Sequence, residues 1–496
     1  MRESGILLPI SSLPSQYGIG CFSKEAYEFV DQLALANQKY WQILPLGPTS
    51  YGDSPYQSFS TYAGNPYFID LNTLIEEGVL TKKECNLADF GSDSRFIDYG
   101  KLYKARYKLL RKAYERSNIS QNPEFQTFQE ENAWWLDDYS LFMVVKGFFQ
   151  DECWDKWPED IKKRYGYALD YYREQLYFEI EFQKYMQFEF SIQWKKLKTY
   201  ANENGIRIIG DIPIYVAYDS ADTWAHPELF QLDEENVPLA VAGCPPDGFA
   251  ADGQLWGNPL YRWDYHRQTG YAWWMQRLSY AFYLYDVVRI DHFRGFDEYF
   301  SIPYGDTTAR NGHWEKGPGI ELFHRMKEVL GERDVIAEDL GYVTDSVRQM
   351  VFESGFPGMK VFEFAFDSRD TGCAGDYLPH NYPVNSVVYT GTHDNATLIG
   401  WYQDIPKEGR EMLRDYIHDY TTSDRSLHWS VICRVMGSPA RICMIPMQDY
   451  LGLNNTCRIN TPSTLGTNWK WRLLDGEFTS DLQNKIKKLV RIYQRN

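Results

Sequence analysis

Short runs of β-branched and aromatic residues recur along the whole chain, and turn-forming residues bound each run. A short, uninterrupted apolar run is typical of a strand that is buried on both faces, as in a parallel sheet. We therefore expect eight strands, at residues 6–10, 40–44, 206–209, 287–290, 335–337, 361–365, 386–390 and 442–446.

Segments with a helical period separate several of these runs. Ser23 is placed to cap a helix in which Phe29 and Leu33 share one face, and further helices are expected at residues 320–330 and 344–355. Strands that alternate with helices pair in parallel through right-handed crossovers. The expected fold is therefore α/β, a (β/α)8 TIM barrel of about 250 core residues with large helical and loop insertions.

Two long gaps between the predicted strands locate the insertions. Residues 45–205 contain aromatic-rich sequence of helical type, such as AWWLDDYSLFMVVKGFF, and predict a helical subdomain. Residues 212–286 contain AGCPPDGFAADGQLWGNPLYRW, whose density of Gly, Pro and Asp predicts a long ordered loop that could act as a lid. Without an internal repeat or an obvious linker, residues 1–496 are expected to form one decorated barrel with no separate C-terminal β domain.

Charge and composition narrow the class of protein. The 496 residues include 51 Lys and Arg against 68 Asp and Glu, a net charge of −17, which argues against nucleic acid or an anionic membrane as a partner. No apolar run reaches the roughly 18 residues of a membrane span, and the start MRESGILLPISS does not resemble a secretory signal. The eight cysteines form no CxxC pair, as in reduced proteins. We expect a cytoplasmic protein.

Aromatic residues make up 17% of the chain, including 38 Tyr and 16 Trp. Composition alone favours a large aromatic core. Amphipathic rings in this number could also line a site for a ligand with apolar faces and a hydroxylated rim, such as a sugar.

Four acidic residues directly follow or end the predicted strands, where a barrel of this type carries its reacting groups. They are Asp211, Asp291, Glu338 and Asp394. Residues two apart on a strand share a face, so Arg289 is expected beside Asp291, where a guanidinium would keep the carboxylate ionised. By the same alternation, only one of Asp291 and His292, and only one of His393 and Asp394, would face the site while the strand continues.

Retaining glycoside chemistry needs two carboxyl groups about 5–5.5 Å apart. Adjacent strands lie about 4.8 Å apart, so Asp291 and a residue on the next strand have a suitable separation. Glu338 is the expected partner, although the local pattern leaves Asp339 open as the residue that faces inward. Asp394, two strands further on, would bind sugar hydroxyls or the distorted ring.

A series of motifs in order closely resembles the amylomaltases, the bacterial 4-α-glucanotransferases related to the α-amylase clan. The motifs are SYGDSPYQSFSTYAGNPYFIDL, GIRIIGDIPIYVA, the PPD and GQLWGNPLY parts of the loop, VVRIDHFRGF, VIAEDLG, TGTHDNATLIGW and NWKWR. The match runs almost from end to end of the chain. It implies a retaining transfer of an α-1,4-glucan segment from a maltodextrin to the 4-hydroxyl of another glucan or of glucose.

The resemblance also implies roles for individual residues. Asp291 would be the nucleophile, Glu338 the acid/base and Asp394 the transition-state stabiliser. The residues that it places at the substrate are Arg289, His393, Asp211, Tyr56, a second glucan-binding surface at Tyr51, and the lid residues Pro246, Asp247, Trp256 and Asn258. The partners would be maltose, maltotriose, maltodextrins and amylose, and the scheme requires no metal or organic cofactor. Gly248 and Ala250 depart from the family pattern in the lid, which leaves the ratio of transfer to hydrolysis open.

Three other functions are compatible with the same residues. An α-1,4-glucan hydrolase would use the same site with water as the acceptor. A metal-dependent isomerase or lyase would use the carboxylates and histidines as ligands, although strand alternation weakens that interpretation. A non-catalytic glucan-binding protein would explain the aromatic content alone.

Overall fold

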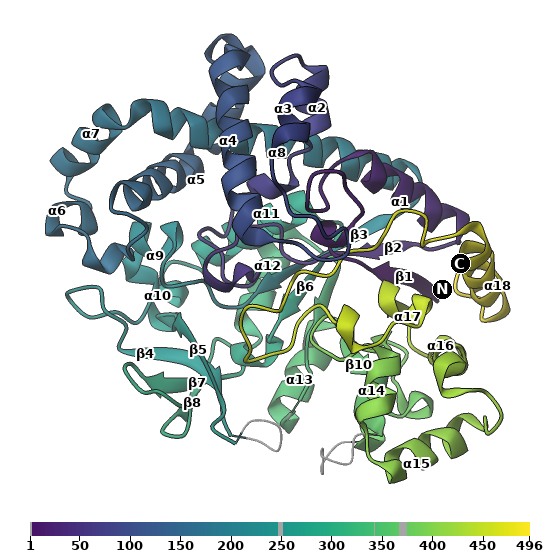
Figure 1. Ribbon diagram of the computed structural model, residues 1–496. Helices are drawn as coiled ribbons and strands as arrows, with labels where there is room; N and C mark the ends of the chain where they lie inside the picture. Colours follow the sequence, from purple (N-terminus) through teal and green to yellow (C-terminus); the bar gives the residue numbers. More distant parts are fainter. Residues whose placement is uncertain (1, 247–250, 342, 367–373) are drawn as a thin grey trace.

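Eight parallel strands close into a barrel at the centre of the molecule (Figure 1). The structure is a computed structural model that describes residues 2–246, 251–341, 343–366 and 374–496. Around the barrel the order is β1-β12-β11-β10-β9-β6-β3-β2, and β1 pairs with both β12 and β2 to close the ring. The strands are β1 Glu3–Leu7, β2 Tyr40–Gln42, β3 Arg207–Pro213, β6 Val287–Asp291, β9 Val335–Ala337, β10 Gly358–Val361, β11 Ser386–Tyr389 and β12 Ile442–Pro446. The predicted (β/α)8 barrel is confirmed.

The sixth barrel strand lies earlier than its apolar run predicted. The expected strand was residues 361–365, but β10 ends at Val361, and Phe362–Ala365 form a 3-10 turn. The strand is anchored by a contact that the local pattern does not show, because the backbone N–H of Met359 donates to Oδ1 of Asp339 at 2.7 Å. Gly358 allows this close approach, since a Cβ there would lie 2.5 Å from Asp339 Oδ2.

Helices predicted from caps and periodicity form where expected. Helix α1 spans Lys24–Leu35, α12 spans Glu321–Leu330 and ends at Gly331, and α13 spans Asp345–Ser354 between Thr344 and Gly355. The hydroxyl of Thr344 accepts from the N–H of Val347. The remaining barrel and C-terminal helices are α14 Leu398–Asp404, α15 Lys407–Ile417, α16 Leu427–Met436, α17 Met447–Leu451 and α18 Ser480–Ile492.

The first long insertion contains helices that stand on one side of the barrel, along the top and the upper left of Figure 1. They are α2 Leu71–Glu76, α3 Lys82–Leu87, α4 Tyr99–Ser117, α5 Pro123–Phe148, α6 Glu159–Lys162, α7 Gly166–Gln175 and α8 Tyr177–Glu203. Helices α5 and α8 pack together. A hydrophobic cluster separate from the barrel core forms here around Trp135, Phe142 and Trp154, and Trp224 of the second insertion packs into it.

The second insertion is more regular than its loop-like sequence predicted. It contains α9 Ala221–Ala225, α10 Trp263–Gln268, α11 Ala272–Leu284, and two strands, β4 Ala240–Cys244 and β5 Gln254–Pro259. These strands join β7 Glu298–Pro303 and β8 His313–Lys316 in a four-stranded sheet of order β5-β4-β7-β8. The expectation of a loop was wrong here because β4 pairs with β7, a segment far along the chain that local sequence cannot show.

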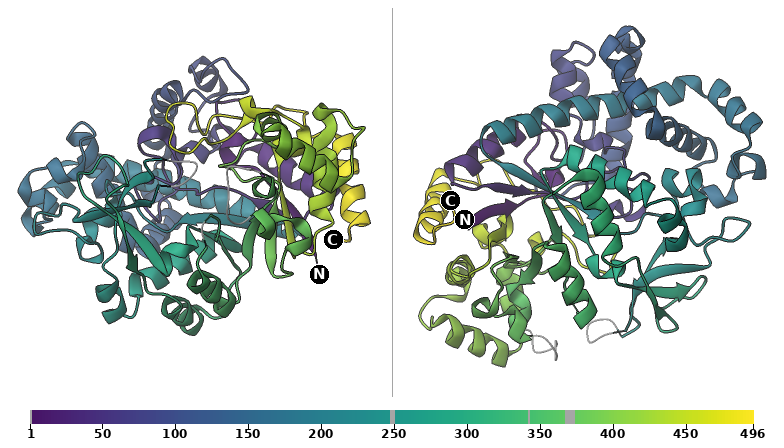
Figure 2. Two further views of the ribbon diagram at one scale, coloured as in Figure 1. Left: turned by 90° about the horizontal axis from the view of Figure 1, so that it is seen from below. Right: turned by 180° about the vertical axis from the view of Figure 1, so that it is seen from behind.

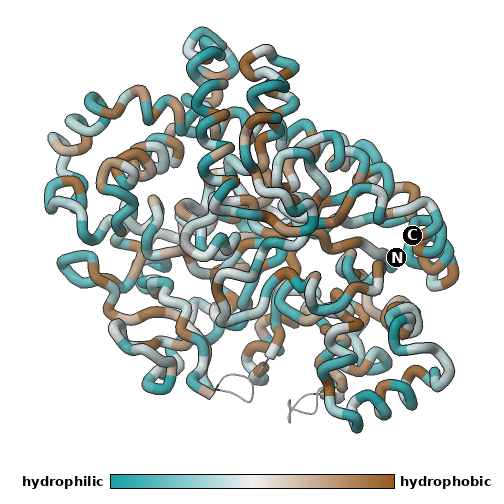
Figure 3. Tube along the Cα trace, viewed as in Figure 1, coloured by the Kyte–Doolittle hydropathy of each residue, from teal (hydrophilic) through white to brown (hydrophobic). Residues whose placement is uncertain are grey.

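The two chain termini lie side by side in every view (Figures 1 and 2). Arg495 is fully buried, and its guanidinium donates to the backbone oxygens of Glu3 and Ala440. Hydrophobic residues concentrate where β1 enters the centre, while hydrophilic and hydrophobic residues alternate around the outer helices (Figure 3). No helix within the described parts of the chain is long and apolar enough to cross a bilayer.

Candidate active site

The four predicted carboxylates lie on one rim of the barrel, at the carboxyl ends of its strands. Asp211 lies in β3, Asp291 ends β6, Glu338 directly follows β9, and Asp394 lies in the segment after β11. Strands β3, β6 and β9 are consecutive neighbours in the barrel, and β11 is two strands beyond β9. The spatial order therefore agrees with the order expected from the sequence.

Asp291 and Glu338 occupy equivalent positions on neighbouring strands. Ile290 of β6 is in register with Ala337 of β9, so the next residue of each strand lies beside the other. Backbone bonds on both sides fix this register, because Glu338 N donates to Ile290 O at 3.1 Å and Phe293 N donates to Glu338 O at 3.0 Å. Adjacent strands lie about 4.8 Å apart, which is close to the separation that retaining chemistry requires.

The structure places Glu338, rather than Asp339, toward Asp291. Glu338 accepts at Oε2 from the backbone N–H of His292, at 2.7 Å, and at Oε1 from that of Leu340, at 3.0 Å. The carboxylate of Asp339 instead turns to β10, where it accepts from Met359 N. The alternative that the sequence left open is therefore resolved in favour of Glu338 at the barrel mouth.

Arg289 lies between two of the carboxylates. Its Nη1 is 2.5 Å from Asp211 Oδ2, and its Nη2 is 3.0 Å from Asp291 Oδ1. Tyr56 donates from its hydroxyl to the same Asp211 oxygen at 2.7 Å. The side chains of Arg289 and Asp211 are 3% and 0% exposed, but Asp291 keeps 28%, so that it can be reached by a ligand. The predicted pairing of Arg289 with Asp291 is present.

Burial and neighbouring charges act differently on the pKa values of the two facing carboxyl groups, Asp291 and Glu338. Burial raises the pKa of Asp291, and the Arg289 guanidinium opposes that rise. Burial also raises the pKa of Glu338, and the Asp291 carboxylate raises it further. Asp291 therefore ionises first, and its charge helps Glu338 to keep a proton, as a nucleophile and a general acid require.

His393 and Asp394 both reach the site, whereas alternation predicted only one. The reason is that β11 ends at Tyr389, so neither residue continues the strand. His393 Nε2 lies 3.2 Å from Asp394 Oδ2, and Asn460 Nδ2 donates to Asp394 Oδ1 at 2.6 Å. Burial would raise the pKa of Asp394, but His393 and the Asn460 amide outweigh it and lower that pKa below the usual range.

Tyr56 stacks on His393, with ring centroids 5.2 Å apart and 14° between the planes. Its ring therefore forms one wall beside Asp394 and is oriented by its hydrogen bond to Asp211. Tyr51 begins the 3-10 turn Tyr51–Asp53, and its side chain lies outside the described part of the structure.

The predicted lid residues have different positions. Trp256 of β5 meets the His292 ring edge to face at 4.8 Å and 90°, and so lies next to the residue that follows Asp291. Asn258 has a packing role, because it donates to Val216 O at 2.8 Å and accepts from Gln57 at 3.2 Å. Pro246 is exposed. The predicted positions Asp247, Gly248 and Ala250 lie outside the described residues.

Two residues of the site were given no role from the sequence. His292 adopts a left-handed backbone with a φ of 54°, and its N–H donates to the Glu338 carboxylate. Asn460 comes from the segment RINTPST, far along the chain from Asp394. The only sequence signal for His292 was its position directly after Asp291. No local signal marked Asn460. Across the described residues, no group of three or more His, Cys, Asp or Glu side chains is arranged to hold a metal ion.

A parallel barrel with two facing carboxyl groups on its carboxyl-end rim defines the class of (β/α)8 enzymes that act on glycosidic bonds. A family model described as 4-alpha-glucanotransferase matches residues 8–477. The chain belongs to this family and is an enzyme that transfers glycosyl groups.

Individual relatives agree with this assignment. The chain is 50% identical to the 4-alpha-glucanotransferase of Clostridium butyricum, over 98% of this chain and 99% of that one. It is 47% identical to the enzyme of Streptococcus pneumoniae, over 100% and 97%. Amylomaltase from Streptococcus agalactiae, solved in complex with acarbose, superposes with a TM-score of 0.96 at 40% identity over 100% of both chains. The resemblance to amylomaltases is confirmed.

Proposed function

We propose that this enzyme cleaves an α-1,4 bond in a maltodextrin and passes the retained glycosyl unit to the 4-hydroxyl of another glucan or of glucose. The observation that carries the proposal is the register of Asp291 and Glu338 on neighbouring strands, with Arg289 beside the first. The amylomaltase complex with acarbose, a relative that matches over its full length, supports α-1,4-glucans as the substrates. These include maltose, maltotriose, maltodextrins and amylose.

In the first half of the reaction, Asp291 attacks the anomeric carbon while Glu338 gives its proton to the glycosidic oxygen. The bond from the anomeric carbon to that oxygen breaks, and the reducing-end fragment leaves with a new 4-hydroxyl. A glycosyl ester on Asp291 remains, with inverted configuration. Arg289 supports this step because it keeps Asp291 ionised before the attack.

In the second half, the Glu338 carboxylate takes the proton from the 4-hydroxyl of an acceptor glucan. The acceptor oxygen attacks the anomeric carbon, the ester bond breaks, and Asp291 returns to a carboxylate. Two inversions give net retention. Both proton transfer and charge stabilisation come from side chains, so the scheme needs no added cofactor.

The surrounding residues would hold the donor. We assign Asp394, fixed by Asn460, to the sugar hydroxyls and the distorted ring, and Tyr56 and His393 to the donor wall. Trp256, with Pro246, would cover the cleft and favour a sugar acceptor over water. Tyr51 would contribute to a second glucan surface.

Pure maltotriose tests the proposal. Transfer yields glucose and longer maltodextrins while the total number of reducing ends stays constant. A rise in reducing ends that equals the loss of substrate would instead establish the hydrolase alternative. Asp291→Asn is expected to abolish turnover and retain glucan binding, and undiminished turnover of this variant would refute the assigned nucleophile.

We further infer a reducing, cytoplasmic environment. Cys21, Cys85 and Cys443 are buried as free thiols, which supports this inference. Separation of cell compartments followed by an activity assay tests it, and activity outside the cytoplasmic fraction would contradict it.

A further inference from the structure

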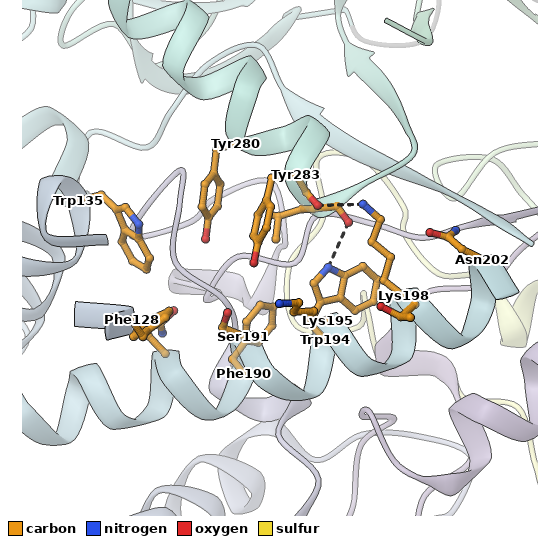
Figure 4. Close-up of a pocket in the computed structure, with 13 residues that line it drawn as sticks. Phe128, Trp135, Phe190, Ser191, Trp194, Lys195, Lys198, Asn202, Tyr280 and Tyr283 are labelled. Carbon is orange, nitrogen blue, oxygen red and sulfur yellow. Dashed lines mark hydrogen bonds between the residues drawn. The ribbon is translucent and has the colours of Figure 1, made fainter. Parts of the chain in front are cut away.

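A pocket of about 230 Å³ lies outside the barrel, between helices α5, α8 and α11 (Figure 4). It contains none of the residues assigned to the catalytic site. Pockets for drug-sized ligands usually measure about 300–1,000 Å³, so this one suits a smaller unit.

One side of this outer pocket is aromatic. Tyr280 and Tyr283 descend from α11 with their hydroxyl ends toward α8, and Trp135 and Phe128 come from α5 (Figure 4). The Tyr280 and Tyr283 ring centroids are 5.8 Å apart. Tyr283 is 56% exposed, so its ring can be covered by a ligand without displacing protein atoms.

The opposite side belongs to α8, which contributes the rings of Phe190 and Trp194 together with a row of polar residues. Ser191, Lys195 and Thr199 follow one another at intervals of four, so they lie along one face of the helix. Lys198 is already held, because it donates to the backbone oxygen of Tyr283 at 2.9 Å. Within the described residues Lys195 makes no hydrogen bond or ion pair, and its donors are available to a ligand.

We propose that the outer pocket is a further non-catalytic binding site for an α-1,4-glucan, distinct from the surface at Tyr51, an inference that rests on the proposed function for its choice of sugar. A pyranose ring presents apolar faces to aromatic rings and hydroxyls to a polar rim. The tyrosine rings on one side of the outer pocket match the apolar faces of the sugar. The serine, threonine and lysine on the other side match its hydroxyl groups. The net charge of −17 disfavours a polyanionic ligand here.

The outer pocket shares a wall with an inner pocket at the catalytic cleft. Phe190, Tyr280 and Leu284 line both this pocket and an inner one that contains Tyr56 and Asp211. Phe190 packs directly on Gly64, where a Cβ would lie 2.2 Å from the ring. A sugar in the outer pocket is therefore separated from Tyr56 and Asp211 by these side chains. The outer pocket holds a long chain near the enzyme while another segment of that chain occupies the cleft.

Two variants of the outer pocket test this proposal in the full-length enzyme. Tyr283→Ala removes the exposed ring, and Lys195→Glu reverses the free charge. Each is expected to raise the KM for amylose by roughly three- to tenfold, because one aromatic or polar contact is lost. The kcat and KM for maltotriose, which is too short to reach both sites, should stay at the wild-type values. Tyr177→Ala is the matched control. Tyr177 is a 64% exposed tyrosine on α8, the helix that carries Lys195, but it lies about 20 Å along that helix from Ser191.

A binding measurement separates this proposal from the proposed function. Asp291→Asn protein and its double variant with Tyr283→Ala are compared for retardation by amylopectin in native gels. Reduced retardation of the double variant supports the site, even if the wild type were to show no transfer from maltotriose. Equal retardation, or an equal loss with Tyr177→Ala, would overturn it. A smaller particle on sedimentation of Tyr283→Ala would also overturn it and assign the pocket to a contact between copies of this chain.

Discussion

The backbone N–H of His292 donates to Oε2 of Glu338 at 2.7 Å. His292 directly follows Asp291, and its φ of 54° turns the chain after it, so that the N–H of Phe293 donates to the backbone oxygen of Glu338 at 3.0 Å. The residue after one carboxyl group therefore orients the other. The separation of the pair depends on this backbone conformation as well as on the register of β6 and β9.

Substitutions at His292 that differ only in backbone preference test this relationship. Asn adopts the left-handed conformation readily, whereas β-branched Val does not. Both remove the imidazole, so any difference between them reports the backbone. We expect the kcat of His292→Val for maltotriose to lie about 100-fold below that of His292→Asn, because a small misplacement of the acid costs this much. Equal kcat values for the two variants would contradict the role of the turn.

Loss of Arg289 should damage both stability and catalysis. Arg289→Gln leaves the buried Asp211 and the Asp291 carboxylate without their shared cation. Removal of one member of a buried ion pair costs about 3–5 kcal/mol in the free energy of unfolding. Urea denaturation measures this loss. The double variant Arg289→Gln/Asp211→Asn removes one of the two unpaired carboxylates and should recover part of the lost stability. An Arg289→Gln variant as stable as the wild type would refute the ion pairs of Arg289 with Asp211 and Asp291.

The pH dependence of kcat/KM follows from the two carboxyl groups. Activity needs Asp291 ionised and Glu338 protonated, and burial raises the pKa of both. The acid limb should therefore lie above the pH at which a free Asp ionises, and the alkaline limb above that of a free Glu. The Asp211 charge contributes to the raised pKa of Asp291, so Asp211→Asn should move the acid limb to lower pH. Profiles with maltotriose measure this shift, and an upward movement of the acid limb would be inconsistent with it.

Sequence alone predicted those parts of the fold that depend on local patterns. The apolar runs identified the eight barrel strands, and the acidic residues at their ends identified the rim, because both signals lie within a few neighbouring residues. The sixth strand shifted because its position depends on a contact between Met359 and Asp339. The sheet that contains β4 and β5 was missed because its pairing with β7 is long-range.

The same distinction applies to the site. Arg289 beside Asp291 follows from alternation on one strand, whereas the choice of Glu338 over Asp339 depends on the backbone of His292 and Met359. Asn460 reaches Asp394 from a segment 66 residues away, and nothing in its own neighbourhood marks it.

Asn460 offers a test of how Asp394 is positioned. Asn460→Ala removes the 2.6 Å hydrogen bond and lets the Asp394 carboxylate rotate, so kcat for maltotriose should fall about tenfold. Asn460→Asp keeps the shape but places a negative charge against Asp394 and should lose more activity. Full activity of Asn460→Asp at neutral pH would show that this contact does not matter.

The balance between transfer and hydrolysis should depend on Trp256. Its ring packs edge to face with the ring of His292, the residue after Asp291, so Trp256→Ala is expected to open the glycosyl ester to water. We expect new reducing ends to form from maltotriose in this variant, at a several-fold higher ratio to released glucose than in the wild type, while Trp256→Phe retains most of the exclusion. Leu255→Ala is the matched control. Leu255 is the neighbour of Trp256 on β5 and is 39% exposed, but its side chain points to the opposite face of the strand. An unchanged ratio in Trp256→Ala would mean that water is kept from the ester by the acceptor sugar itself rather than by the lid.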